Sequence, residues 1–355
     1  INTVKKIIKR GRDGEFDNRS KAPLNQPTKI STDLVKEILD YRKDMGMGAL
    51  NLKHQYEINT SASTIYRTLK RQCKIKPRKK KWQQSKDLRE IKKKYKAFEY
   101  VQVDGKVLYD ITKFYKYYVR CFVPRLQFTF TCQKTGASFI SYAEGETMIE
   151  GCTFITYVLE HLKRFGIDVK KLRIKTDLGS YAIGSARTFK QSAFTKLIQN
   201  VYQAKHRLIK HKNQNSDVER FHGLIEEYFY KRTKPSSQAD FFRKSFEYIV
   251  WHNMFRKNSG KNWQTPLQIL KQDYPNIDPQ ILVLTPIYLN QHTDIYYYKA
   301  GLKVPELTKE DFFRDSAPKF YNWFTSDIYQ DDFQYYFGDA KKSSYIKKNK
   351  GVVTI

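Results

Sequence analysis

Residues 31–73 carry apolar side chains at helical spacing. The first helix is expected to begin after Ser31 or Thr32 and to end near Gly46, and its buried face would hold Leu34, Val35, Ile38 and Leu39. A short second helix is expected over ALNLKHQYEI, and a third over TSASTIYRTLKRQ after a break at residues 59–60. The apolar face of the third helix would comprise Ala62, Ile65, Tyr66 and Leu69.

The opposite face of the third helix is basic and carries hydroxyl groups. A short basic helix after a tight turn is typical of the recognition helix of a helix-turn-helix domain, which fits the major groove of DNA. We therefore expect residues 31–73 to form such a DNA-binding domain. The alternative is an ordinary three-helix bundle with a solvated basic face. The expected DNA-contacting residues are Ser63, Thr64, Arg67, Lys70 and Arg71.

From residue 98 to about 275 the pattern changes to strands and helices. A strand over YVQVDGKVLYDI precedes a hairpin of RLQFTFTC and ASFISYAEG. Helices are expected over residues 147–165, 188–201 and 238–256 and over NSDVERFHGLIEEYFYKR, with the short strands LRIKTD and HRLIK between them. A hairpin followed by alternating strands and helices predicts an α/β domain, in which a mixed sheet has helices on both faces.

The remaining segments differ in composition from these two domains. Residues 1–30 are basic and broken by Gly and Pro, which predicts an arm or linker, and the absence of an initial Met suggests an upstream segment. Residues 74–97 are dense in Lys and Arg and predict a linker, either solvated or holding DNA phosphates through Arg78, Lys79, Lys80 and Lys81. Residues 276–355 are rich in aromatic residues and predict a small β-rich accessory domain with a basic tail.

Composition narrows the class of partner. The 66 Lys and Arg residues exceed the 36 Asp and Glu residues, which gives a formal net charge of +30 and implies a polyanionic partner. No apolar run approaches the roughly 18 residues that cross a bilayer, so nucleic acid is favoured over a membrane. The four cysteines form no CxxC pair, which argues against a thiolate zinc site and favours a reducing, cytoplasmic location on the nucleoid.

Three acids occupy positions that a mixed sheet can bring together. Asp104 lies inside the apolar strand VQVDGKV, Asp177 ends the strand LRIKTD, and Glu219 stands in the first turn of a helix. Each has a simpler interpretation: a hydrogen-bonded strand acid, a turn-forming residue, and a capping box with Ser216, respectively. Carboxylates held together repel one another, and a hard divalent cation with oxygen ligands is the usual reason for such a cluster.

Several motifs stand in a defined order along the chain. ASTIYRTLKR and KIKPRKKK are followed by VQVDGKVL, then by KTDLGS, SDVERFHGLIEEYFY and WHNMFRKNSGKNWQTPLQIL. In this order they resemble the helix-turn-helix, basic linker and catalytic segments of the retroviral-integrase-like DDE transposases of bacterial insertion sequences. Leu178 stands where that family usually has Asn, and Tyr181 and Ala182 stand where an acid and an aromatic residue are common.

The resemblance implies a ribonuclease H-like catalytic domain over residues 98–275. In it, Asp104, Asp177 and Glu219 would bind two Mg²⁺ ions, with Mn²⁺ as a substitute. The implied activity is hydrolysis of the phosphodiester at an element's end, followed by transfer of the freed 3′-hydroxyl to target DNA. The implied assembly is a homodimer or larger multimer on transposon-end DNA and target DNA.

The helix that carries Glu219 raises three further expectations. Arg220 is expected to contact a DNA phosphate or to pair with a nearby acid. His222 is expected to contact a phosphate or a metal-bound water, with a plain surface histidine as the alternative. Ser216 or Asp217 is expected to cap the helix so that Glu219 is free. Two other functions stay open at this point. One is a catalytically inert, sequence-specific DNA-binding regulator, and the other is a structure-selective nuclease of the same fold.

Overall fold

A computed structural model of the chain describes residues 2–12, 14, 30–72, 91–184, 191–209 and 215–304. Arg78, Lys79, Lys80 and Lys81, expected to hold phosphates, lie outside these residues, as does the basic tail. No helix within the described ranges is long and apolar enough to cross a membrane.

The N-terminal part of the chain is helical. Its helices are α1 (Asn2–Arg12), α2 (Thr32–Met45), α3 (Ala49–Gln55) and α4 (Ala62–Gln72). Helices α2 to α4 lie where the apolar spacing predicts them, and the Ser31 hydroxyl accepts a hydrogen bond from the amide of Leu34 as the cap of α2. Within the segment expected to be an arm or linker, residues 2–12 form helix α1, and its apolar residues Val4, Ile7 and Ile8 are exposed.

The buried face of α4 includes Thr68 in place of Tyr66, and Ala62 is only partly buried. Ile65, Thr68 and Leu69 are buried, whereas the Tyr66 side chain is 48% exposed. At about 100° per residue, Thr68 and Leu69 follow Ile65 on one face of a helix and Tyr66 does not. Tyr66 therefore lies on the exposed side of α4.

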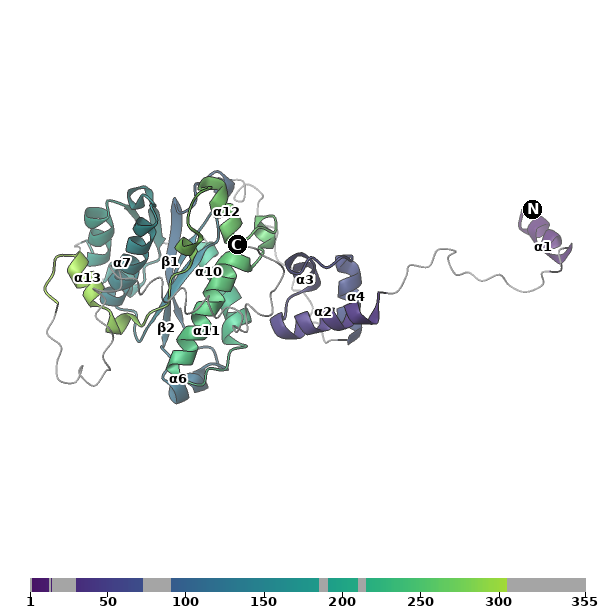
Figure 1. Ribbon diagram of the computed structural model, residues 1–355, viewed down its shortest axis with the longest axis horizontal. Coiled ribbons are helices and arrows are strands. Elements are labelled where there is room, and N and C mark those ends of the chain that lie inside the picture. The colour runs from purple at the N-terminus through teal and green to yellow at the C-terminus, as the bar shows by residue number, and fades with distance from the viewer. Residues whose placement is uncertain are drawn as a thin grey trace.

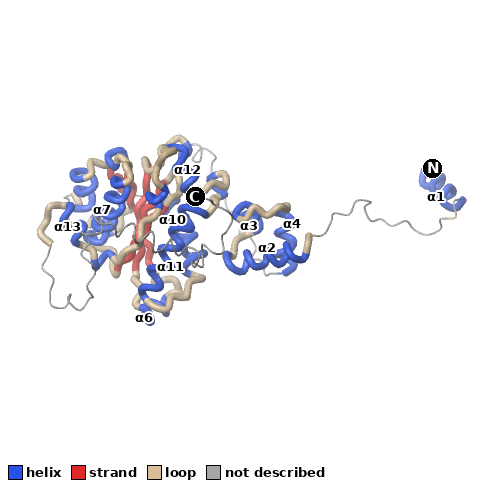
Figure 2. The backbone as a smooth tube through the Cα atoms, viewed as in Figure 1, coloured by secondary structure: helices blue, strands red, loops and turns tan. Residues whose placement is uncertain are grey.

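The centre of the protein is a five-stranded mixed sheet, which confirms the predicted sheet type (Figures 1 and 2). Its strands lie in the order β3-β2-β1-β4-β5, where β1 pairs antiparallel with β2 and parallel with β4. The β2–β3 pair is antiparallel and the β4–β5 pair is parallel. The strands are β1 (Tyr100–Val107), β2 (Leu126–Cys132), β3 (Ser138–Ala143), β4 (Arg173–Thr176) and β5 (Lys205–Leu208).

Helices cover both faces of this sheet (Figure 1). One buried cluster joins Val101 and Val103 of β1 to α7, and a second joins β3 to α10 and α11. The α-helices are α6 (Tyr115–Cys121), α7 (Met148–Arg164), α8 (Ser180–Ile183), α9 (Ala193–Lys196), α10 (Ser216–Ile225), α11 (Gln238–Val250), α12 (Pro266–Asp273) and α13 (Asp294–Lys299). Short 3₁₀ and π segments are η1 (Val169–Lys171), η2 (Leu197–Val201), η4 (Glu226–Tyr230), η5 (Trp251–Phe255), η6 (Ser259–Lys261), η7 (Pro279–Leu282) and η8 (Leu289–Gln291).

Residues 276–304 are the described part of the segment expected to form a β-rich domain, and residues 305–355 lie outside the described residues. In this described part of it, the regular segments are helical, namely η7, η8 and α13. Their buried residues join the cluster around α7, and the buried His161 ring nitrogen Nε2 lies 2.9 Å from the carbonyl oxygen of Ile281. This segment therefore packs as part of the α/β core. Its apolar residues fill gaps beside α7 and do not follow the alternation of a strand.

Candidate active site

Asp104 lies in β1, directly opposite Thr129 of β2, with a side chain that is only 15% exposed. Burial raises the pKa of its carboxyl group to about 8, and the nearby carboxylate of Asp177 is the next cause. Glu146 and Glu219 raise the pKa further, while a hydrogen bond from the amide of Gly105 opposes them. The structure therefore brings Asp104 within electrostatic range of three other acids.

Asp177 follows β4 directly, as expected of the second acid. Its Oδ1 accepts hydrogen bonds from the amide of Gly179 at 3.0 Å and from the hydroxyl of Tyr181 at 3.2 Å. The same hydroxyl lies 3.0 Å from the carbonyl oxygen of Val103, so buried Tyr181 links Asp177 to the strand of Asp104. Asp177 thus forms the turn that its simpler interpretation predicts. Its carboxylate nevertheless lies beside Asp104.

A glycine is required immediately after this turn. A Cβ atom on Gly179 would lie 2.5 Å from the Tyr181 ring and 2.7 Å from Oε1 of Glu146. Leu178, which replaces the family's usual Asn, is 49% exposed. The residue that differs from the family, Leu178, therefore lies at the surface. Gly179 has no side chain, and this allows Glu146 to lie close to the turn that holds Asp177.

Glu219 lies in the first turn of α10 with an exposed side chain. The expected cap from Ser216 or Asp217 is not formed. Instead, Oε1 of Gln102 accepts hydrogen bonds from the amides of Asp217 and Val218, both at 3.0 Å. A side chain from β1 thus satisfies the start of α10, and Glu219 is not needed for a capping box.

Asp217 has a structural role. Its carboxylate Oδ2 lies 2.6 Å from Nζ of Lys92 and accepts a hydrogen bond from the side chain of Gln133 at 3.1 Å. These contacts agree with a structural role for Asp217, because its carboxylate is engaged by Lys92 and Gln133.

Glu146 is a fourth acid of this site that the sequence did not identify. It lies two residues before α7, is half-buried, and has its pKa raised by burial and then by Asp177. A Cβ atom on Gly105 would lie 3.3 Å from its Oε1, which places this carboxylate beside β1. In the sequence Glu146 is simply an acid ahead of a helix, and the β3 to α7 connection is what returns it to the sheet.

The four carboxylates provide only oxygen donors, which suit a hard divalent cation. Within the described ranges, no three His, Cys, Asp or Glu side chains are grouped closely enough to hold a metal ion. Asp104, Asp177 and Glu219 therefore interact electrostatically without forming a compact ligand set. Their donor chemistry and mutual repulsion fit a cation, and ligation would bring the side chains closer.

His222 occupies a different environment from the expected DNA surface. Its Nε2 lies 3.0 Å from the hydroxyl oxygen of Thr129, and its Nδ1 lies 4.0 Å from Oδ2 of Asp104. Burial lowers the pKa of the imidazole to about 3, with Lys106 as a further cause. His222 is thus a neutral residue between α10 and the sheet. Arg220 is exposed, and its guanidinium donates a hydrogen bond to Oδ1 of Asn258 at 3.2 Å.

The expected DNA-contacting residues of α4 are mostly accessible. Ser63, Arg67, Lys70 and Arg71 are exposed. Thr64 is partly buried, and its hydroxyl lies 2.8 Å from that of Ser61 at the start of the helix. Thr64 is therefore engaged in the local structure of the helix start.

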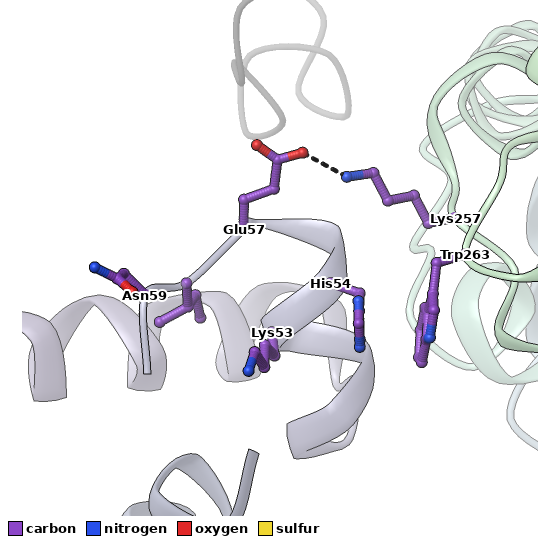
Figure 3. A pocket seen from close by; sticks show the side chains of 7 residues that line it. Lys53, His54, Glu57, Asn59, Lys257 and Trp263 are labelled. Carbon is purple, nitrogen blue, oxygen red and sulfur yellow. Dashed lines mark hydrogen bonds and ion pairs between the residues drawn. The ribbon is translucent and has the colours of Figure 1, made fainter. Parts of the chain in front are cut away.

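Helix α3 and the segment after η5 meet at a pocket of about 390 Å³ (Figure 3). The rings of His54 and Trp263 stack with centroids 3.9 Å apart, and Nζ of Lys257 lies 2.7 Å from Oε1 of Glu57. The side chain of Gln55 also bonds the backbone at Phe255 and Lys257. These contacts attach the three helices α2, α3 and α4 to the α/β core. We call this contact the dock, and it is made by His54, Gln55, Glu57, Lys257 and Trp263.

Comparison with known proteins assigns no family to this chain. No protein-family model matches the chain, and no curated protein matches it. Among solved structures, it is similar to a chain of the cryo-EM structure of the simian T-cell lymphotropic virus intasome in complex with PP2A regulatory subunit B56 gamma. The identity is 11% and the TM-score 0.39, over 66% of this chain and 72% of that chain. At this level the functional conclusion rests on the residues themselves.

Proposed function

We propose that this protein is a DDE-type DNA transposase whose catalytic carboxylates are Asp104, Asp177 and Glu219. The observation that carries the proposal is the cluster of acids around Asp104, whose pKa is raised to about 8. Like charges at a partly buried site destabilise the fold unless a cation neutralises them. The formal net charge of +30 adds support, because the phosphodiester of a polyanion is the substrate that such a protein attracts.

Two Mg²⁺ ions, or Mn²⁺ in their place, would be held by Asp104, Asp177 and Glu219. When bound, such ions activate the attacking oxygen and stabilise the charge on the leaving oxygen of a phosphodiester. The residues of the chain position these acids. Tyr181 holds Asp177 against β1, and Gln102 fixes the start of α10.

The proposed reaction has two in-line displacements at phosphorus. In the first, a water oxygen bonds to phosphorus at the element's end, and the bond to the 3′-oxygen breaks to release a 3′-hydroxyl. In the second, that hydroxyl oxygen bonds to a phosphorus of the target strand, and the target's own 3′-oxygen leaves. Each step exchanges one phosphorus–oxygen bond for another and needs no redox partner.

Helix α4 would recognise the terminal repeats of the element. Ser63, Arg67, Lys70 and Arg71 are exposed on it, a set suited to base edges and phosphates. Joining two element ends to one target would require at least a dimer on DNA. Phosphate contacts would make binding fall steeply with salt concentration.

Cleavage and strand transfer on DNA that flanks the protein's own coding region test the proposal. Duplexes carrying inverted repeats from that DNA, incubated with Mg²⁺, are expected to yield nicked and joined products. Glu219→Gln should abolish both products. Glu227→Gln is the matched control, because this exposed acid lies two turns further along and pairs with Lys231.

The outcomes separate the proposal from its alternatives. Unchanged activity in Glu219→Gln would refute the catalytic triad. Specific binding without metal-dependent nicking would indicate a DNA-binding regulator, and cleavage without joined products would indicate a nuclease.

A further inference from the structure

The connection between β1 and β2 is longer than its strands require. Val107 and Leu126 are direct partners in the antiparallel register, and a two-residue turn is enough to join such strands. Here residues 108–125 intervene and include α6, which lies at the lower end of the sheet in Figure 1. The connection is therefore much longer than the pairing of β1 with β2 needs. We refer to residues 108–125 as the α6 excursion.

The α6 excursion is firmly anchored on its inner side. Leu108, Phe114 and Val123 are almost completely buried. The ring of Phe114 packs edge-on against Tyr230 of η4 with centroids 5.1 Å apart, and it also contacts Phe241 of α11. These contacts hold the excursion in one place relative to the helix that carries Glu219.

Its outer side presents apolar side chains to solvent. Four of these large side chains are about half exposed or more: Tyr109, Tyr115, Val119 and Phe122. Phe122 is the extreme case, with 74% of its side chain exposed and a left-handed backbone at φ 50°. A bulky residue in that conformation costs roughly 1–2 kcal/mol, and glycine would adopt it more easily. Neither packing nor backbone preference therefore explains a phenylalanine at this position.

The same surface is basic. Lys113, Lys116 and Arg120 are exposed, and in the part of the chain that the structure describes none of them pairs with an acid. Asp110 is the only acid of the excursion. A second copy of a chain with net charge +30 would bring like charges together here, whereas a polyanion would neutralise them.

We propose that the α6 excursion binds unpaired DNA, with Tyr115 and Phe122 stacking on exposed bases and Lys116 and Arg120 contacting phosphates. Aromatic side chains interleaved with basic ones are the usual means of holding single strands. Bases in an intact duplex have their faces covered by neighbours, so exposed rings favour DNA that is locally unpaired. This inference rests on the proposed function for the identity of the nucleic acid, and adds a second DNA surface away from α4.

Binding of a fluorescent oligothymidine of about 16 nucleotides to the full chain, compared with a blunt duplex, tests the proposal. Phe122→Gly is the first variant, because glycine keeps the left-handed backbone and the exposed ring contributes little to the fold. It is expected to weaken binding of the single strand about tenfold, with duplex binding changed by less than about twofold. Tyr115→Ala should act in the same direction.

Lys116→Gln with Arg120→Gln should lower the salt dependence of single-strand binding. Tyr298→Ala is the matched control, because Tyr298 is an exposed tyrosine of α13 on a different part of the molecule, and it should bind as the unchanged protein does.

Two results would overturn the proposal. One is absence of single-strand binding by the unchanged protein, and the other is equal binding by Phe122→Gly. Loss of self-association in Phe122→Gly without loss of DNA binding would show a protein partner instead. If the unchanged protein cleaves and joins element ends while Phe122→Gly binds single strands normally, only this inference fails. If it binds single strands through Phe122 but cleaves nothing, the proposed function fails alone.

Discussion

The side chain of Gln102 caps the helix that carries Glu219: its Oε1 lies 3.0 Å from the amide nitrogen of Val218 and 3.0 Å from that of Asp217. Gln102 is two residues from Asp104 on the same face of β1, so one hydrogen-bonded group links the strand of the first acid to the helix of the third. The distance between the two acids is thereby set by a residue with no chemistry of its own.

Replacing Gln102 by Met keeps its length and removes the acceptor. We expect a loss of about 1 kcal/mol in unfolding free energy, as for other helix caps, and a fall in strand cleavage at temperatures well below melting. The matched control is Gln268→Met, since Oε1 of Gln268 likewise accepts a hydrogen bond from a backbone amide, that of Thr265, at the start of α12, a helix that carries none of the three acids. Equal cleavage by the two variants at equal folded fraction would contradict a positioning role for Gln102.

The raised pKa of Asp104 gives stability a specific dependence on pH. The folded carboxyl group titrates at about 8 and the unfolded one near its ordinary value of 3.8, so the folded state holds the extra proton between these pH values. Stability without metal should therefore fall as pH rises from about 4 to about 8, and level off above that. Asp104→Asn should raise the free energy of unfolding by a few kcal/mol at pH 9 and by little at pH 4.

Thermal melts across this pH range, with and without Mg²⁺, provide the measurement. In the unchanged protein, Mg²⁺ should stabilise more at pH 9 than at pH 6, because cation binding requires the deprotonated carboxylate. Asp104→Asn should lose this response. A gain in stability of the same size at pH 4 and pH 9 would mean that electrostatics is not the cause.

Glu146→Gln should relieve part of the same repulsion. Since Glu146 raises the pKa of Asp104, its removal should shift the fall in stability of the metal-free protein to lower pH. Glu144→Gln is the control, because Glu144 lies two residues earlier and bonds the hydroxyl of Tyr288 at 2.6 Å instead. If both variants show the same pH profile in thermal melts, Glu146 does not belong to the acidic site.

Sequence patterns predicted the parts of this protein that repeat along the chain. Alternating apolar residues placed β1, β2 and β3, and helical spacing placed α2 to α4 and α10. The patterns also located Asp104, Asp177 and Glu219, because each falls at a recognisable point of a strand or helix. In the structure, the carboxylates of Asp177 and Glu219 lie close enough to Asp104 to raise its pKa.

The sequence patterns did not predict the features that depend on tertiary packing. Glu146 joins the acids only because the chain returns to the sheet after β3, and Gln102 caps α10 across a long sequence separation. Residues 276–304 looked like the start of a separate domain, yet their apolar residues fill the surface beside α7. Such contacts depend on which helices and strands pack together, and local periodicity in the sequence does not predict this.

The dock between α3 and the core should be separable from folding. Trp263 has a left-handed backbone, with φ 62°, while its ring stacks on His54. Trp263→Gly allows the same backbone conformation without strain and removes the ring, so any loss in the free energy of unfolding measures the contribution of the ring stack. A double-mutant cycle that combines this variant with His54→Ala should give a coupling energy of about 0.5–1.5 kcal/mol between the two rings.

Hydrogen exchange would locate this effect. Amides of α3 should exchange faster in Trp263→Gly, while those of β1 should not change. Leu52 of α3 belongs to the buried cluster that also contains α10 and α11, whereas Val101 and Val103 of β1 belong to the other cluster. Tyr66→Ala, which removes an exposed ring of α4 outside the dock, should leave both rates as they are. A zero coupling energy together with unchanged exchange in α3 would show that the stack does not hold these helices to the core.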